Sequence, residues 1–214
     1  MITFTRLGQY LTILGNCQTK FKPIKNLSVD EGMIGFRERL SFRQYMPAKP
    51  TKYGIKVWMA ADSNNGYVLN FDVYLGKEVD GCWHIYGLGY DVVTKLIRPF
   101  MNRNHHLFFD NFFTSTKLLE HLEASDTYAC GTLRCNRKDL PPCVKDKLRV
   151  GEKVVHQKGH VFTKWHDKRD VSVMATNVSP LADDVEVNRG DREVPKPVVI
   201  ALCKEVCFTD YHML

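Results

Sequence analysis

Residues 105–115 read HHLFFDNFFTS, and the order of polar and apolar side chains in this stretch decides the fold. Residues 106–109 form an apolar run that is typical of a short buried strand. Asp110 follows where this strand ends, and Thr114 or Ser115 can cap a helix that begins directly afterwards. The sequence therefore predicts a strand, a loop that carries a carboxylate, and then a helix that runs to about residue 123.

A second carboxylate follows an apolar strand in the segment NLSVDEGM, residues 26–33. Residues 26–30 are expected to form a brief strand that ends in Asp30. If the two strands lie side by side, Asp30 and Asp110 meet at one sheet edge, and their oxygens suit a hard cation such as Mg²⁺. Each aspartate taken singly also fits a turn or a helix cap. Glu31 would point to the opposite face if the strand continues.

The chain between these aspartates predicts two antiparallel strands and a helix. We expect strands at residues 53–61 and 67–75, joined by the turn Asp-Ser-Asn-Asn-Gly at residues 62–66. On the second strand, alternate side chains from residue 67 to residue 75 would share one face. Residues 90–98 place apolar side chains at helical spacing, and Pro99 stops that helix.

A further strand is expected at residues 128–133, after the helix that follows Asp110. A strand, helix and strand in this order lay parallel strands into one sheet through a right-handed crossover. Three antiparallel strands followed by parallel additions match an α/β fold of the ribonuclease H-like type, a mixed sheet with flanking helices.

Composition changes along the chain indicate four units. A helix at residues 4–14 belongs to an N-terminal helical segment, residues 1–25, and residues 26–135 form the ribonuclease H-like core. Residues 136–197 are expected to be a β-rich inserted subdomain with strands at 150–156, 160–165 and 170–176. The polar, proline-bounded residues 179–197 within it read as a flexible loop. Residues 198–214 are the last unit, a C-terminal tail, and the family resemblance set out below implies that this tail is aberrant or truncated.

Composition describes a globular chain that can bury a core. Of its 214 residues, 44% are hydrophobic, and no apolar stretch approaches the roughly 20 residues of a membrane span. We therefore expect a soluble, intracellular protein without a membrane partner. The seven cysteines form no Cys-x-x-Cys pair, which favours reduced thiols, and Cys203 and Cys207 alone would make an incomplete metal site.

The charge of the chain favours a polyanion. Thirty Lys and Arg against 24 Asp and Glu give a net charge of +6, and basic residues cluster after Asp30 and after the strand at 128–133. A solvated basic face is the alternative interpretation. The candidate DNA-binding residues are Arg37, Arg39, Arg43, Lys49, Lys52, Lys56, Arg134, Arg137 and Lys138.

Other side chains near the second aspartate could take part in a site. His105 and His106 could be metal ligands, although a loop or a hydrogen bond at the sheet edge explains them equally. Asn111 could position a phosphate or a metal-held water, or cap a turn. Trp83 and Trp165 could stack on unpaired bases, but most single tryptophans are core residues.

Several segments, in this order, closely resemble the catalytic domain of piggyBac transposases and of genes derived from them. They are the stretch beginning DEGMIGFRERLSFRQYMPAKPTKYGIK at residue 30, HHLFFDNFFTSTKLLEHL at 105–122, GTLRCNRKDLPP at 131–142 and KWHDKRDVSVMAT at 164–176. The resemblance covers about residues 27–197. It implies a ribonuclease H-like transposase with three catalytic aspartates and two Mg²⁺ or Mn²⁺ ions, in which Asp30 and Asp110 match the first two aspartates.

The resemblance also implies partners and a location. We expect double-stranded DNA, namely transposon ends that are joined to TTAA targets through hairpinned ends. Homodimerisation is left open, and a nuclear location is expected.

The sequence departs from the family after Lys196-Pro197, where a glycine-glycine-valine-aspartate motif is expected and VVIALCKEVCFTDYHML stands instead. Asp210 lies near the expected place of the third aspartate without that motif, and Asp183 and Asp184 precede it. Loss of one ligand should cripple phosphoryl transfer, because electrostatic stabilisation supplies much of such catalysis.

Three hypotheses follow for function. The first is a truncated transposase catalytic domain that is inactive alone. The second is a domesticated, non-catalytic module that binds DNA or a partner through the basic segment at residues 37–56. The third is a decaying fragment that does not fold stably.

Overall fold

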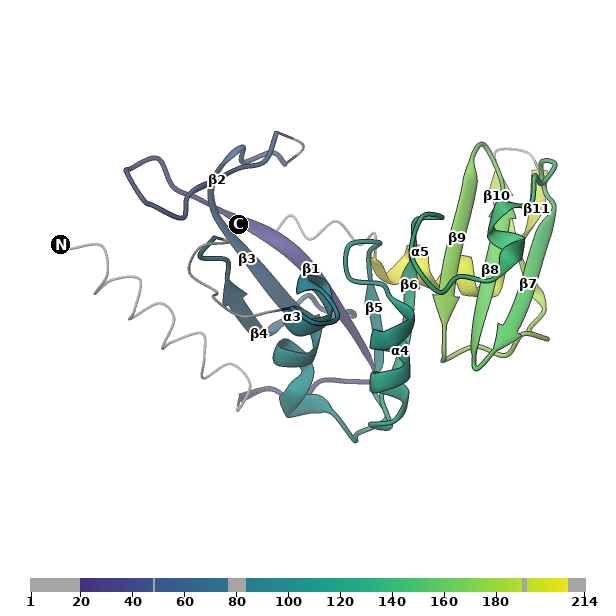
Figure 1. The fold of residues 1–214 in the computed structure, drawn as a ribbon, viewed down its shortest axis with the longest axis horizontal. Coiled ribbons are helices and arrows are strands. Elements are labelled where there is room, and N and C mark those ends of the chain that lie inside the picture. Colours follow the sequence, from purple (N-terminus) through teal and green to yellow (C-terminus); the bar gives the residue numbers. More distant parts are fainter. Residues whose placement is uncertain (1–19, 48, 77–83, 190–191, 208–214) are drawn as a thin grey trace.

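The computed structural model describes residues 20–47, 49–76, 84–189 and 192–207 of the chain. The helix expected at residues 4–14 and Trp83 lie outside this part. The elements are β1 Asn26–Gly35, β2 Gln44–Tyr45, β3 Tyr53–Asp62, β4 Val68–Val73, α3 Leu88–Ile97, the 3₁₀ turn η1 Arg98–Phe100, β5 His106–Phe109, α4 Thr116–Glu123, β6 Tyr128–Thr132, the 3₁₀ turn η2 Pro142–Lys145, β7 Lys153–Lys158, β8 His160–His166, β9 Asp170–Ala175, β10 Asp184–Arg189, β11 Arg192–Pro197 and α5 Val198–Cys207 (Figure 1).

A mixed sheet of nine strands organises the described residues. Strand β3 is antiparallel to β1 and also to β2 and β4, and β5 and β6 then run parallel to β1. The expected α/β sheet, with three antiparallel strands followed by parallel additions, is therefore confirmed. Beyond β6 the sheet continues through β9 and β8 to β7, so these strands extend away from α3 and α4 (Figure 1).

Strand β1 is twice as long as expected. It has ten residues and pairs with β3 as far as Gly35 opposite Gly54. The prediction that the strand ends at Asp30 is therefore wrong, because antiparallel pairing with β3 carries the backbone past this residue. The register places Asp30 opposite Met59 and Glu31 opposite Trp58.

The predicted alternation along the second antiparallel strand is wrong in part. The register of β4 on β3 shifts between Ala60 and Ala61, which leaves an extra residue in β4. Leu69 therefore enters the main core, whereas Phe71 packs with a separate cluster that contains Ile55. A bulge of this kind reverses which alternate residues face the core.

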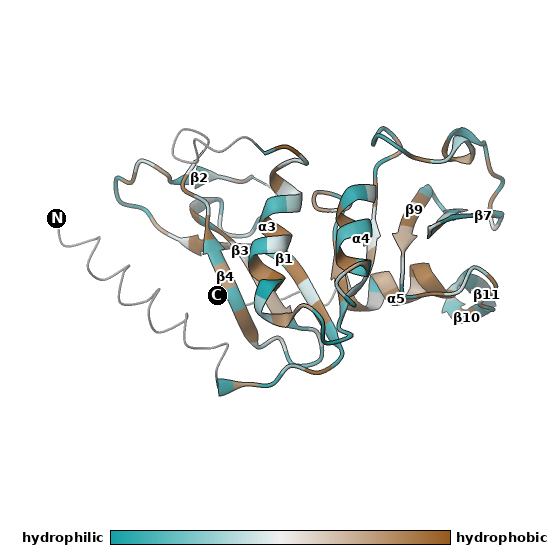
Figure 2. Cartoon of the chain, turned by 60° about the horizontal axis from the view of Figure 1, so that its bottom comes forward, coloured by the Kyte–Doolittle hydropathy of each residue, from teal (hydrophilic) through white to brown (hydrophobic). Residues whose placement is uncertain are grey.

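Helices cover both faces of the sheet. Leu107 and Phe109 of β5 pack in the main core with the apolar faces of α3 and α4, while Phe108, between them, packs in the cluster that contains Val199 and Ile200 of α5. The predicted helix before Pro99 is confirmed as α3. Ser115 is the N-cap of α4, and its Oγ accepts a hydrogen bond from the Leu118 amide at 3.3 Å. Brown and teal portions of α3 and α4 in Figure 2 show their amphipathic character.

Residues 184–189 and 192–197 form two paired strands, although residues 179–197 were expected to be a flexible loop. Strands β10 and β11 pair antiparallel, with Val187 opposite Val194. Val185 and Val187 alternate with polar residues, which is the pattern of a strand. The low hydrophobic content of the segment outweighed this pattern in the prediction of a loop.

The segment expected to be an aberrant tail is a packed helix as far as Cys207. In α5, Val199, Ile200, Cys203 and Val206 are buried against the sheet. The burial of Cys203 assigns this thiol to the core. No helix in the described part of the chain is long and apolar enough to cross a membrane.

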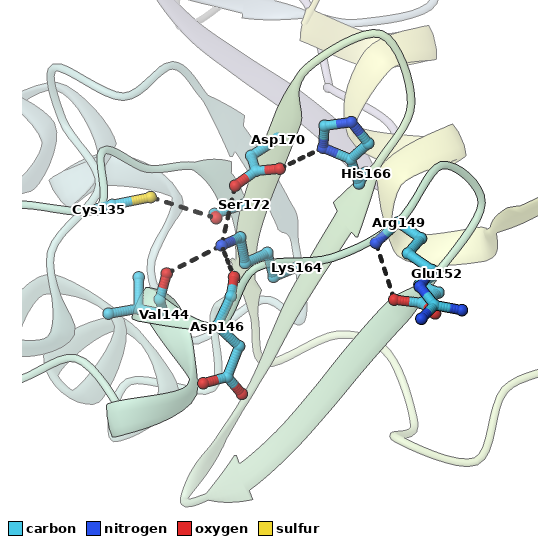
Figure 3. Close-up of polar contacts among 9 residues, drawn as sticks. All are labelled: Cys135, Val144, Asp146, Arg149, Glu152, Lys164, His166, Asp170 and Ser172. Carbon is cyan, nitrogen blue, oxygen red and sulfur yellow. Dashed lines mark hydrogen bonds and ion pairs between the residues drawn. The ribbon is translucent and has the colours of Figure 1, made fainter.

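A buried lysine fastens the connection between β6 and β7 to the sheet. The Lys164 side chain is 3% exposed, and its Nζ donates to the carbonyl oxygens of Val144 at 3.1 Å and Asp146 at 2.5 Å (Figure 3). It also forms an ion pair with Asp170 at 2.9 Å, and Asp170 contacts the imidazole of His166. The ammonium group thus satisfies one backbone carbonyl of the turn η2 and one of the residue that caps it.

Replacement of Lys164 by Ala should lower the free energy of unfolding by about 2 kcal/mol or more, because it removes charge-assisted hydrogen bonds to carbonyls. Urea unfolding of the purified chain measures this change. Lys168→Ala, at an exposed position in the next turn, is the matched control and should change stability by less than about 0.5 kcal/mol. Equal stability of the two variants would contradict the role given to Lys164.

Candidate metal and nucleic-acid site

Parallel pairing of β1 and β5 brings Asp30 and Asp110 together. The last paired residues in the register are Val29 of β1 and Phe109 of β5. Asp30 and Asp110 are the next residue on each strand, so they lie on adjacent backbones. The charge of Asp110 also raises the pKa of Asp30, so the two carboxylates are close enough to interact.

Local hydrogen bonds fix both carboxylates. Asp30 Oδ1 accepts from the Glu31 amide at 2.7 Å, and Asp110 Oδ1 accepts from the Phe112 amide at 2.9 Å. Thr114 Oγ1 donates to the Asp110 carbonyl oxygen at 2.8 Å, which closes the loop before α4.

Close packing against β6 holds this loop in place. A Cβ atom at Gly131 would lie 2.3 Å from Thr114 Oγ1 and 2.7 Å from a ring carbon of Phe109. A glycine in β6 therefore lets β5 and the loop after it approach closely, which sets the position of Asp110.

The electrostatics of the pair favour a bound cation. Burial raises the pKa of Asp30 above its ordinary value, the neighbouring Asp110 raises it further, and the Glu31 amide and Lys49 oppose this effect in part. Burial also raises the pKa of Asp110, as does the charge of Glu31, whereas the Phe112 amide and Arg134 lower it. Two desolvated carboxylates that repel each other gain from a divalent cation between them.

Replacement of either aspartate by Asn should raise the free energy of unfolding of the metal-free chain at neutral pH. Both carboxyl groups have a folded pKa above the ordinary 3.8, so the folded state binds more protons than the unfolded state between these values. The contribution of these groups to stability is therefore full below pH 3.8 and is lost as pH rises through the folded pKa. Asp30→Asn and Asp110→Asn escape this loss.

Thermal unfolding in EDTA, from acid to neutral pH, measures the effect. The advantage of Asp30→Asn and Asp110→Asn over the natural chain should grow as pH rises. Glu186→Gln, at an exposed position on β10, should follow the natural chain at every pH. If the difference in stability between each Asn variant and the natural chain stays constant or falls as pH rises, the two carboxylates are not destabilised by burial and by each other's charge.

Four of the predicted basic residues lie around the two aspartates. Lys49 Nζ donates to the Glu31 carbonyl oxygen at 3.0 Å, and Lys56 forms an ion pair with the Glu31 carboxylate at 2.5 Å. Arg134 and Arg137, which follow β6, bind the loop after Asp110. Arg134 Nε donates to Asn111 Oδ1 at 2.8 Å, and Arg137 donates to the Asn111 carbonyl oxygen at 2.6 Å.

The other predicted basic residues occupy exposed positions. Arg43 donates to the Arg37 carbonyl oxygen at 2.9 Å and lies 5.7 Å from the ring centroid of Tyr53. These residues, together with Arg39 and Lys52, belong to the chain around β2. Lys138 is exposed directly after Arg137.

The structure separates the histidine and tryptophan candidates from this place. His105 and His106 stand at the start of β5, whereas Asp110 follows its end, so they cannot share a cation with the aspartates. Trp165 is 2% exposed in the core, so the hypothesis that it stacks on bases is wrong. The side-chain oxygen of Asn111, which was a candidate to position a phosphate or a metal-held water or to cap a turn, accepts a hydrogen bond from Arg134.

The third carboxylate is not among the described residues. These residues contain no group of three or more His, Cys, Asp or Glu side chains that could hold a metal ion. Asp184 forms an ion pair with Lys153 at 2.5 Å, and Asp183 is exposed beside it, while Asp210 lies outside the described part. The sequence did not indicate Glu31 as a site residue, but its charge raises the pKa of Asp110. This proximity depends on the pairing of β1 with its neighbouring strands, which no local sequence pattern shows.

Comparison with known proteins supplies the family. The model of the transposase family described as Transposase IS4 matches residues 5–207. The chain is 29% identical over 183 residues to the human (Homo sapiens) PiggyBac transposable element-derived protein 3, and the match covers 81% of this chain and 31% of the relative. The chain belongs to the piggyBac family of transposases.

Two further comparisons agree with this assignment. The human PiggyBac transposable element-derived protein 2 is 29% identical over 181 residues, with 78% of this chain and 30% of the relative covered. A cryo-EM structure of a piggyBac transposase synaptic complex with hairpin DNA matches the fold with a TM-score of 0.78 and 28% identity. That match covers 95% of this chain and 42% of the transposase chain. This piggyBac-family chain therefore spans less than half the length of the relatives it matches.

Proposed function

We propose that this chain is the part of a ribonuclease H-like transposase catalytic domain that binds a divalent cation and DNA. The observation that carries the proposal is the juxtaposition of Asp30 and Asp110 at the ends of adjacent parallel pairings, where burial raises both pKa values and the charge of Asp110 raises that of Asp30 further. Burial and a neighbouring carboxylate both disfavour the charged form of each group, so a cation between the two carboxylates stabilises their ionised forms.

The donor set fits Mg²⁺ or Mn²⁺. Both groups are hard oxygen ligands, and local amides fix one oxygen of each carboxylate. When bound, such ions supply charge stabilisation for phosphoryl transfer. Asp30 and Asp110 would hold and orient them as the first two of three catalytic aspartates, while Arg134 and Arg137 would bind phosphates beside them.

The remaining expectations belong to the same proposal. Residues 26–135 would form the catalytic core, residues 136–197 its β-rich insertion, and residues 1–25 an N-terminal helical segment. The DNA partner would be a double-stranded transposon end and a TTAA target, handled in the nucleus, with homodimerisation as a further expectation. The synaptic complex of the matched transposase with hairpin DNA supports the DNA partner.

Mg²⁺ or Mn²⁺ should raise the melting temperature of the natural chain, because a ligand that binds only the folded state stabilises it. Asp30→Asn and Asp110→Asn should each abolish the shift, and Glu186→Gln should retain it. Differential scanning fluorimetry across a range of metal concentrations measures this. A full shift in either Asn variant would contradict a shared cation.

DNA binding should weaken steeply with salt, because phosphate contacts release counterions. Arg134→Ala and Arg137→Ala should each lower affinity for duplex DNA and reduce the slope of log K against log salt by about 1. Arg98→Ala, at an exposed position on η1, is the control. Fluorescence anisotropy at several salt concentrations measures the slopes, and an affinity that is independent of salt would contradict the proposal.

A non-catalytic DNA-binding module is the second candidate. It is favoured by the absence of a third carboxylate among the described residues. A cleavage assay on TTAA-flanked ends with Mg²⁺ or Mn²⁺ separates the two functions. Cleavage that is lost in Asp30→Ala and Asp110→Ala supports catalysis, and equal background in all three proteins supports the module.

A further inference from the structure

A groove of about 760 Å³ lies beside the candidate metal site. Its lining comes from residues 85–90 before and within α3, from residues 112–113 and 115–117, and from residues 134 and 136–139 after β6. Phe112 belongs to this lining, and its amide donates to the Asp110 carboxylate. The groove is therefore lined in part by the loop that follows Asp110.

The charge of this groove favours an anion. The side chains in its lining that carry a formal charge at neutral pH are Lys117, Arg134, Arg137, Lys138 and Asp139. Lys117 forms an ion pair with Glu120, but no ion pair within the described part of the chain involves Arg134, Arg137 or Lys138. The hydrogen bonds of the two arginines go to neutral amide and carbonyl oxygens, so none of these bonds ties either guanidinium group to a carboxylate.

Exposed apolar side chains line the same groove. Ile85 is 84% exposed, Tyr86 is 55% exposed and Phe112 is 36% exposed. Aromatic rings that remain exposed between cationic side chains suit a ligand with both an aromatic face and negative charge. Nucleotides carry both, and base stacking on aromatic side chains is a general mode of single-strand binding.

The fold holds these walls in fixed positions. Gly87 has φ of 95°, and its amide donates to the His84 carbonyl oxygen at 3.1 Å, which makes a tight turn around Tyr86. His84 Nδ1 contacts Asp91 of α3 at 2.5 Å and anchors the start of this turn. A Cβ at Gly89 would lie 2.9 Å from the Phe112 carbonyl oxygen, so α3 packs directly on the floor of the groove.

The paired bases of a duplex are stacked on one another and cannot lay a face against Tyr86, whereas an unpaired base can. We propose that the groove binds an unpaired nucleotide of the DNA strand that reaches Asp30 and Asp110. Its base stacks on Tyr86, and its phosphates contact Arg134 and Arg137. This inference rests on the proposed function and adds a position for unpaired DNA to it.

The test compares two DNA probes on the natural chain and three variants. One probe is a short duplex with a central bulge that contains 2-aminopurine, and the other is the same duplex fully paired. Tyr86→Ala removes the ring and Tyr86→Phe keeps it. Tyr45→Ala, at a tyrosine that is 56% exposed on β2, is the matched control.

The natural chain should bind the bulged probe more tightly than the paired one and quench its 2-aminopurine emission. Tyr86→Ala should bind the bulged probe about 10-fold more weakly and should no longer quench its 2-aminopurine emission. Its affinity for the fully paired probe should be unchanged. Tyr86→Phe and Tyr45→Ala should behave as the natural chain. Because Tyr86 is exposed, its variants should keep the same melting temperature.

Equal affinity of the natural chain for both probes, or binding without a change in emission, overturns the inference and leaves the proposed function standing. The same holds if Tyr86→Ala binds and quenches like the natural chain. The quench is measured on the natural chain itself, so it decides even if a variant fails to fold. Failure to bind either probe at low salt overturns the proposed function together with the inference.

Discussion

Parallel pairing of β1 with β5 is the constraint on which the site depends. It places Asp30 and Asp110 one residue beyond the last pair in the register, directly after the buried residues Val29 and Phe109 of the main core. The same burial that stabilises the sheet withdraws water from the two carboxylates and raises their pKa values. The proposed cation site thus follows from how the core is built, since the strands that carry the aspartates are central in the sheet.

The basic residues near the site are organised by the same loop that carries the second aspartate. Asn111 and Phe112 supply the oxygens that bind Arg134 and Arg137, while Lys49 and Lys56 approach from the β2 and β3 side and contact Glu31. Cations therefore flank the carboxylates from both directions without pairing with them directly. This arrangement suits a polyanion that is held near a metal ion.

The sequence could predict those features that depend on local pattern. The apolar run before Asp110, the cap at Ser115 and the helix stop at Pro99 are all local signals, and they were enough to obtain the order of the central strands. It could not predict the full length of β1, because residues beyond Asp30 are held in the strand by pairing with β3. The bulge at Leu69 and the hairpin of β10 and β11 also depend on a partner strand, which composition does not reveal.

The site was predictable at the level of its two aspartates, and less so for what surrounds them. The desolvation of Asp30 and the contacts of Arg134 arise from residues far apart in the sequence, so no spacing rule indicates them. The most direct test of the central claim is anomalous diffraction from crystals of the chain soaked in Mn²⁺. We predict a peak between the carboxylates of Asp30 and Asp110, and a Mn²⁺ peak that lies elsewhere with neither aspartate as a ligand would contradict the account.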